Sequence, residues 1–136
     1  MYDNFDKLIF FRNLLCQKTK AKKFIRGHFG EDDGILLSAD RTPNLRGALI
    51  TGLASSYPKE NLNLLGQALK KGQLDTLIVM GEDLMDAKVD AELLSDVQII
   101  YLGTHENATS TLAQVVIPTL TPFEKSGSFV NRSFFL

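Results

Sequence analysis

The side chains best suited to chemistry fall into adjacent pairs that follow short apolar runs. His105 lies next to Glu106, and an imidazole beside a carboxylate can transfer a proton. Glu82 lies next to Asp83, and paired carboxylates can act as general acid and base. Neither pair has a third partner at a spacing typical of catalysis or metal binding. We therefore interpret both pairs as loop side chains and predict no catalytic and no metal-ligating residue.

Patterns that mark other kinds of active site do not occur in the sequence. No serine lies in a G-x-S-x-G setting, and neither the glycine-rich dinucleotide pattern nor the P-loop pattern occurs. Cys16 is the only cysteine, and one thiol cannot hold an iron–sulphur cluster or a structural zinc ion. Its apolar neighbours instead predict a buried structural thiol.

The composition predicts a globular chain without a strong electrostatic field. The 136 residues are 44% hydrophobic, and 15 Lys and Arg oppose 16 Asp and Glu, which gives a net charge of −1. Such a balance argues against nucleic acid as a partner. The basic run from Lys18 to Arg26 is interpreted as a solvated surface, with contact to phosphate or to an acidic partner as the alternative. The chain has no signal-peptide pattern and no apolar run of bilayer length, so we expect a cytoplasmic protein without direct membrane insertion.

Strands and helices are expected to alternate in the second half of the chain. Three short apolar runs predict strands that end at a glycine or proline, at residues 74–80, 97–102 and 115–117. Helical patterns precede or separate them at residues 58–71, 87–94 and 107–113. This alternation predicts a three-layer α/β fold, in which helices flank a short, Rossmann-like parallel sheet.

The first half of the chain is less regular. A helix is expected to begin at Asp3 or Asn4 and to end near Gly27, so residues 1–34 are interpreted as a helical lead-in. Residues 34–38 predict a short strand or an irregular segment. Residues 45–53, which are small and apolar, predict a tight turn or a short helix.

Ligands of open parallel sheets bind beyond the carboxyl ends of the strands. The three expected strand exits meet at one edge of the sheet, and any small-molecule site should lie there. The candidate binding residues are those of the three exits: Gly81, Glu82, Asp83, Gly103, Thr104, His105, Glu106 and Pro118.

The segments around the third strand resemble a known family. Residues 112–118 read LAQVVIP and residues 123–132 read FEKSGSFVNR. This order resembles the A-D-V-V-L-P and E-K-x-G-T-F-x-N pattern of molybdopterin oxidoreductases. Upstream, residues 81–84 stand where that family has G-x-N-P. The runs at 106–109 and 44–48 resemble its E-T-A-like and N-x-x-G-A segments. The resemblance covers roughly residues 35 to 132 and implies a fragment of the formate dehydrogenase and dimethyl sulfoxide reductase-like fold.

Within this family the sequence most resembles the large iron–sulphur subunit of NADH-quinone oxidoreductase (complex I), known as its G subunit. That resemblance implies a non-catalytic structural and interaction role in the peripheral arm, with other subunits or domains of a respiratory complex as partners. It implies iron–sulphur clusters elsewhere in the parent protein and no cofactor in this fragment. Asp83, Leu84 and Gln114 depart from the family pattern, and a carboxylate facing a diphosphate is unfavourable. The candidate binding residues are therefore interpreted as vestigial.

Two other readings stay open. The chain can be a molybdopterin-nucleotide-binding fragment of a molybdenum oxidoreductase such as a formate dehydrogenase, or an unrelated α/β module for a small ligand. The apolar residues 134–136 predict that the chain is a piece of a longer protein, with a buried terminal strand as the alternative.

Overall fold

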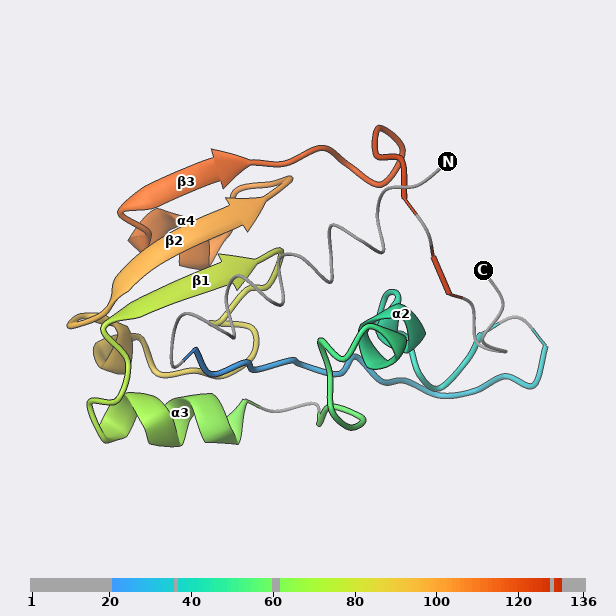
Figure 1. Ribbon diagram of the computed structural model, residues 1–136, viewed down its shortest axis with the longest axis horizontal. Coiled ribbons are helices and arrows are strands. Elements are labelled where there is room, and N and C mark those ends of the chain that lie inside the picture. Colours follow the sequence, from blue (N-terminus) through green and yellow to red (C-terminus); the bar gives the residue numbers. More distant parts are fainter. Residues whose placement is uncertain (1–20, 36, 60–61, 128, 131–136) are drawn as a thin grey trace. The chain divides into compact units, whose positions relative to one another are not determined.

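The chain divides into two compact units in the computed structural model (Figure 1), which describes residues 21–35, 37–59, 62–127 and 129–130. Unit 1 contains Met1–Glu60 and Ser126–Leu136, and unit 2 contains Asn61–Lys125. The beginning of the expected first helix and the apolar end of the chain lie outside the described residues.

Unit 2 contains a parallel three-stranded sheet, as the sequence predicted. Its strands are β1 (Thr76–Met80), β2 (Gln98–Gly103) and β3 (Val115–Pro118), hydrogen-bonded in the order β1-β2-β3. Both strand pairs are parallel (Figure 1). Gly81, directly after β1, has a φ of 67°, a conformation that glycine adopts without strain and that turns the chain out of the strand.

Two helices of unit 2 begin or end where the sequence predicted them to. Helix α4 spans Ala108–Leu112, with Asn107 and Ala113 as its caps. Helix α3 spans Asn63–Lys70 and is followed by Gly72 at a φ of 59°, as expected of a glycine beyond a helix end. However, the predicted start of α3 at Pro58 was wrong. Lys59 instead pairs with Arg26 in an isolated parallel bridge, which holds this stretch in an extended conformation.

The helix predicted at residues 87–94 is shorter than expected. Only the 3-10 helix η1 (Ala91–Leu94) forms there. Lys88 has a φ of 60°, which interrupts a right-handed helix, and the Asp90 side chain accepts a hydrogen bond from the Glu92 amide as a new N-cap. Local polar bonding therefore replaces the first part of the helix that hydrophobic spacing suggested.

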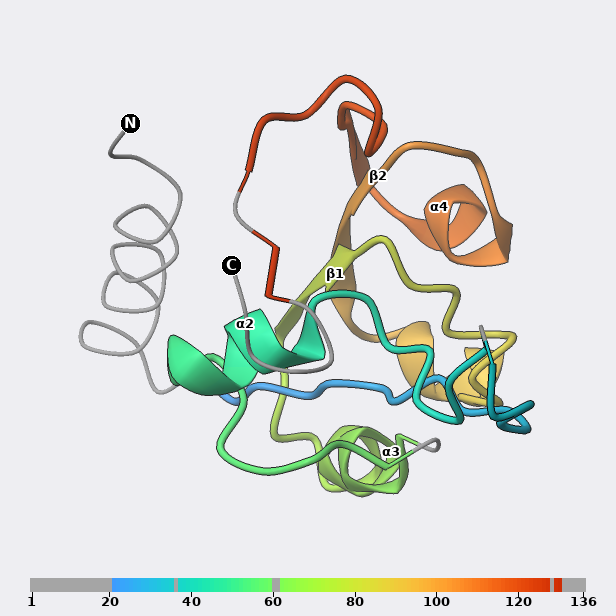
Figure 2. The same ribbon diagram turned by 90° about the vertical axis from the view of Figure 1, so that its right-hand side faces the viewer.

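The sheet of unit 2 is buried on one face along β1 and β2, while all four residues of β3 are exposed. Val79, Ile99 and Tyr101 are buried, and they alternate with exposed or half-buried neighbours along their strands. Helix α4 and the segment that contains η1 lie on the same side of the sheet (Figure 2). This arrangement follows from connectivity, since right-handed crossovers between consecutive neighbouring strands place both connections on one face. The apolar strand sequences suggested a sheet that is buried on both faces. Within residues 62–125, only one face of the sheet is buried.

Among its described residues, unit 1 contains one short helix, α2 (Leu45–Ile50), as expected for residues 45–53. Phe29 and Asp40 form an antiparallel bridge. Residues 21–27 are not helical, so the expected first helix does not continue to Gly27; the Gly27 amide instead donates to the Lys59 carbonyl at 2.8 Å. Across the described parts of both units, no helix is long and apolar enough to cross a bilayer.

Candidate functional site

The exit of β1 is organised around Asp83. Its half-buried carboxylate accepts a hydrogen bond from the Met85 amide at 2.9 Å and another from the Thr109 hydroxyl at 3.1 Å. The Gly81 amide is bonded to the Leu102 carbonyl of β2 at 2.7 Å. The carboxylate expected to face a ligand is thus engaged by the protein's own donors.

Thr109 connects this exit to helix α4. The residue is fully buried, with 0% exposure, and its hydroxyl oxygen accepts a hydrogen bond from the Leu84 amide at 2.7 Å. A buried amide without a partner costs about 1–3 kcal/mol, so this hydroxyl stabilises the loop substantially. No local sequence pattern marks Thr109, because its partners are 25 and 26 residues away along the chain.

The exit of β2 carries an exposed pair in front of a buried tyrosine. The Thr104 hydroxyl lies 2.6 Å from Nδ1 of His105, and His105 and Glu106 are both exposed. Behind them, Gly103 packs so closely on Tyr101 that a Cβ at this position would lie 2.4 Å from the ring. Glycine is therefore needed here for packing against the protein itself.

The amino end of α4 is closed by its own side chains. The Asn107 carbonyl oxygen Oδ1 accepts from the Ser110 amide at 2.9 Å, and the Ser110 hydroxyl accepts from the Asn107 amide at 2.8 Å. These reciprocal bonds form a capping box. Asn107 Nδ2 also donates to the Tyr101 hydroxyl at 2.8 Å. The pattern N-x-x-S at residues 107–110 was a sequence signal for this cap.

The exit of β3 continues the edge formed by the other two. Pro118 pairs with Gly103 in register, and the Thr119 amide donates to the Gly103 carbonyl at 2.9 Å. Beyond it, the Thr121 hydroxyl and amide donate to Oε2 of Glu124 at 2.7 Å and 2.9 Å. These hydrogen bonds hold the pKa of the exposed Glu124 carboxyl below its ordinary value.

Gln114 lies away from the strand exits. It precedes β3, at the amino end of the strand, where its Oε1 accepts from the Ile99 amide at 2.6 Å and its Nε2 donates to the Leu112 carbonyl at 3.3 Å. The side chain therefore ties β3 to β2 at the edge opposite the candidate site. Its departure from the family pattern bears on strand pairing and not on the exit edge.

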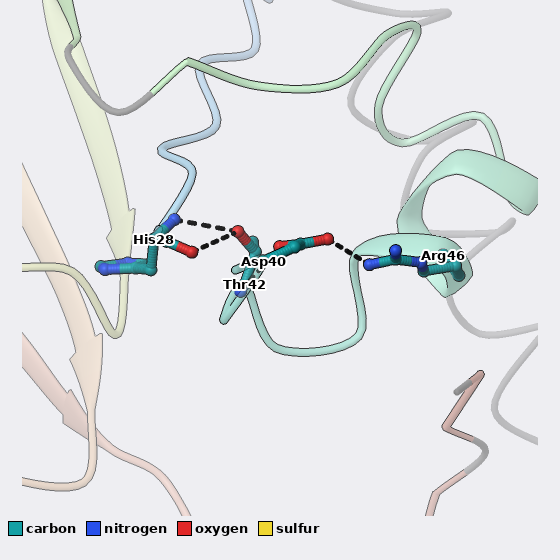
Figure 3. A network of polar contacts seen from close by, with 4 residues as sticks. All are labelled: His28, Asp40, Thr42 and Arg46. Atoms are coloured by element: carbon teal, nitrogen blue, oxygen red, sulfur yellow. Dashed lines mark hydrogen bonds and ion pairs between the residues drawn. The ribbon is translucent and has the colours of Figure 1, made fainter. Parts of the chain in front are cut away.

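A second polar network lies in unit 1 around Arg46 (Figure 3). Arg46 forms an ion pair and hydrogen bond with Asp40, and its guanidinium carbon lies 5.6 Å from the centre of the Tyr57 ring. The side chains of Arg46 and Asp40 are only 14% and 13% exposed. The Thr42 hydroxyl accepts from the His28 amide at 2.9 Å. No short sequence motif marks this network, because its members are spread over residues 28–57.

The acid–base state of Asp40 is set by competing effects. Burial raises the pKa of its carboxyl, but hydrogen bonds from Thr42 and the bond and charge of Arg46 outweigh burial and lower the pKa below 3.8. The carboxylate form is therefore stabilised in the folded protein. Among the described side chains, Nε of Arg46 is the one buried polar atom without a hydrogen-bond partner.

The strand-exit edge does not fit the nucleotide diphosphate that the family resemblance implies. Residues 81–84, 103–107 and 118–121 include no Lys or Arg, while they include three carboxylates. At the amino end of α4, the Ser110 amide is one of the donors that could receive a phosphate, and it is bonded within the capping box. In the part of the chain that the structure describes, no group of three or more His, Cys, Asp or Glu residues could hold a metal ion.

Comparison with known proteins gives one match. The family model described as molybdopterin oxidoreductase matches residues 13–134. No curated protein and no solved structure matches the chain. The family match spans both units and all of the described helices and strands. It therefore excludes the reading of the chain as a module unrelated to this family.

Proposed function

Because the chain belongs to the molybdopterin oxidoreductase family, we propose that it is a non-catalytic structural and interaction domain of a larger oxidoreductase. The resemblance described above favours the large iron–sulphur subunit, the G subunit, of NADH-quinone oxidoreductase. Its place would be the cytoplasmic peripheral arm of that complex. Iron–sulphur clusters would be held elsewhere in the parent protein, and other subunits or domains would be the partners.

The observation that carries this proposal is the apolar face of the sheet that the described part of unit 2 does not itself cover with a helix. The strand register places six apolar side chains on this face: Ile78, Met80, Ile100, Leu102, Val115 and Ile117. Ile78, Met80 and Ile117 are 45%, 62% and 44% exposed. No strand residue on this face is charged. We call these six residues the open face.

The chemistry of the open face suits a helix. Parallel sheets are normally covered by helices on both faces, and both crossovers of unit 2 lie on the other face. We therefore propose an amphipathic helix of a neighbouring subunit as the occupant.

Paired substitutions on the two faces of β1 test the proposal. Ile78→Ser with Met80→Ser makes the open face polar, and Val79→Ala removes buried methyl groups from the other face. We expect the double variant to keep its thermal stability but to lose stoichiometric co-purification with NADH dehydrogenase subunits. Val79→Ala should lower stability by about 1–3 kcal/mol without removing those partners from the folded fraction. Unchanged co-purification of the double variant would contradict the proposal.

A second candidate is a molybdopterin-nucleotide-binding fragment of a molybdenum oxidoreductase such as a formate dehydrogenase. The family match favours it, since the match includes all three strand exits. It predicts a fluorescent pterin released when the purified parent protein is denatured, together with molybdenum by elemental analysis. If the chain is part of the complex I subunit, this domain should give neither pterin fluorescence nor molybdenum. The two candidates therefore predict opposite results in the same measurement.

A further inference from the structure

One buried hydroxyl joins the exit of β1 to helix α4. Thr109 accepts from the Leu84 amide at 2.7 Å and donates to Asp83 Oδ1 at 3.1 Å, while the Met85 amide donates to the same Oδ1 at 2.9 Å. The two bonds of Thr109 connect the loop after β1 to helix α4, and the third lies within the loop. The Thr109 hydroxyl is thereby used as both donor and acceptor.

Two neighbouring amides, those of Asn107 and Ser110, are also bonded to side chains of the protein. In many α/β proteins the free amides of a first helical turn after a strand receive a phosphate group. In α4 the Ser110 amide is bonded to Asn107 Oδ1 at 2.9 Å, and the Asn107 amide is bonded to the Ser110 hydroxyl at 2.8 Å. Asn107 is fixed in turn by the Tyr101 hydroxyl at 2.8 Å. A phosphate could reach these amides only by displacing side chains that already satisfy them.

We infer that Asp83 and Thr109 form a structural latch, and that this latch with the Asn107–Ser110 cap closes the strand-exit edge to the pyrophosphate group of a nucleotide. The charge of Asp83 is secondary, because its carboxylate is bonded to Thr109 and Met85. The inference deepens the proposed non-catalytic role. It rests on that proposal in one respect only, namely that this domain holds no cofactor. It is independent of the partner proposed for the open face.

Nucleotide binding by the full chain tests the closure. GDP and inorganic pyrophosphate are the probes, and the backbone amide signals of residues 81–85 and 103–110 report binding by NMR. We expect no saturable shift in the wild-type protein at probe concentrations up to about 5 mM. Its affinity for the probes would then be weaker than that of a typical nucleotide site by orders of magnitude. A saturable shift of these amides in the wild type would overturn the inference.

Two variants separate the latch from charge. Thr109→Val keeps the shape of the side chain and the Asp83 charge but removes the hydroxyl, so hydrogen exchange of the Leu84 amide should accelerate about tenfold or more. Asp83→Asn removes the charge but keeps an oxygen that accepts hydrogen bonds, so it should leave that exchange rate within about threefold and create no nucleotide binding. Binding created by Asp83→Asn alone would show that charge, not the latch, closes the edge.

Two further variants serve as controls. Thr111→Val removes an exposed hydroxyl of the same helix, which donates to the Asn107 carbonyl at 3.1 Å, and should not change exchange at Leu84. Thr109→Ser retains the hydroxyl and should restore slow exchange at Leu84 even if Thr109→Val proves too unstable to study. Fast exchange in Thr109→Ser, or slow exchange in Thr109→Val, would refute the latch. Association through the open face is measured separately, so each proposal can fail alone.

Discussion

The side chain of Asn44 accepts a hydrogen bond from the backbone amide of Val130, 86 residues later in the chain, at 3.0 Å. Both residues belong to unit 1, and Val130 is buried. Asn44 lies in the N-x-x-G-A segment and Val130 in the F-x-N segment through which the chain resembles its family. Two motifs that are far apart in the sequence are therefore joined by one bond inside one unit.

We predict that Asn44→Ala destabilises unit 1. Asn44 has a φ of 49°, which asparagine tolerates better than alanine, and its loss leaves the Val130 amide without this acceptor. The expected loss is about 1–3 kcal/mol in the free energy of unfolding, measured by denaturant titration. Asn44→Gly keeps the left-handed conformation and isolates the cost of the bond. Equal stability of Asn44→Gly and the wild type would show that the bond contributes nothing.

Alanine at two helical glycines should have opposite effects. At Gly47 of α2 a Cβ would lie 2.4 Å from Oδ1 of Asn44, so Gly47→Ala should displace Asn44 and cost about 1–3 kcal/mol. At Gly66 of α3 a Cβ would meet no atom within 4 Å, so Gly66→Ala should stabilise by about 0.5–1 kcal/mol. Thermal unfolding of the two variants checks the prediction. A gain at both positions would contradict the close approach of Asn44 to Gly47.

The free energy of unfolding should fall in acid because the Asp40 carboxylate becomes protonated. Its pKa in the folded protein is lowered from 3.8, so the stabilisation is complete above pH 3.8 and is lost as the pH falls through the folded pKa. Asp40→Asn should therefore be less stable than the wild type at pH 7, with a difference that shrinks below pH 3.8. Asp96→Asn, at an exposed position, is the control and should follow the wild-type curve. A constant difference between Asp40→Asn and wild type across this range would argue against the titration.

We predict that lysine cannot replace Arg46 without a loss of stability. The guanidinium group is paired with Asp40 and lies over the ring of Tyr57, and an ammonium group cannot keep this planar geometry. We expect Arg46→Lys to cost about 1–2 kcal/mol in the free energy of unfolding. Arg41→Lys is the matched control, because Arg41 is exposed and donates to a single carbonyl at 3.3 Å. Similar losses for the two variants would mean that the planar group of Arg46 has no special role.

Some elements followed directly from local sequence. The three apolar runs form strands because β-branched and aliphatic residues suit a pleated backbone, and the glycine at position 81 ends β1 with a positive φ. Helix α4 formed as expected because Asn107 and Ser110 satisfy each other's amides within four residues. Interactions of this kind are complete within a short stretch, so spacing alone reveals them.

Other elements depended on partners far along the chain. The predicted start of a helix at Pro58 failed because Lys59 pairs with Arg26, 33 positions earlier. The role of Asp83 was expected from its charge, but a hydroxyl 26 residues later bonds its carboxylate. Periodicity describes neighbours on one element, and it holds no information about which distant donor reaches a given side chain.

The sequence by itself determined the alternation of strands and helices and the three exits at one edge of the sheet, because these depend on local propensity and on the handedness of crossovers. The tertiary structure alone decided that the apolar strands bury one face within unit 2. It alone decided that polar groups at the exits of β1 and β2 are hydrogen-bonded to Thr109 and within the Asn107 cap. Burial and hydrogen-bond satisfaction are properties of surroundings, which arise only when distant segments meet.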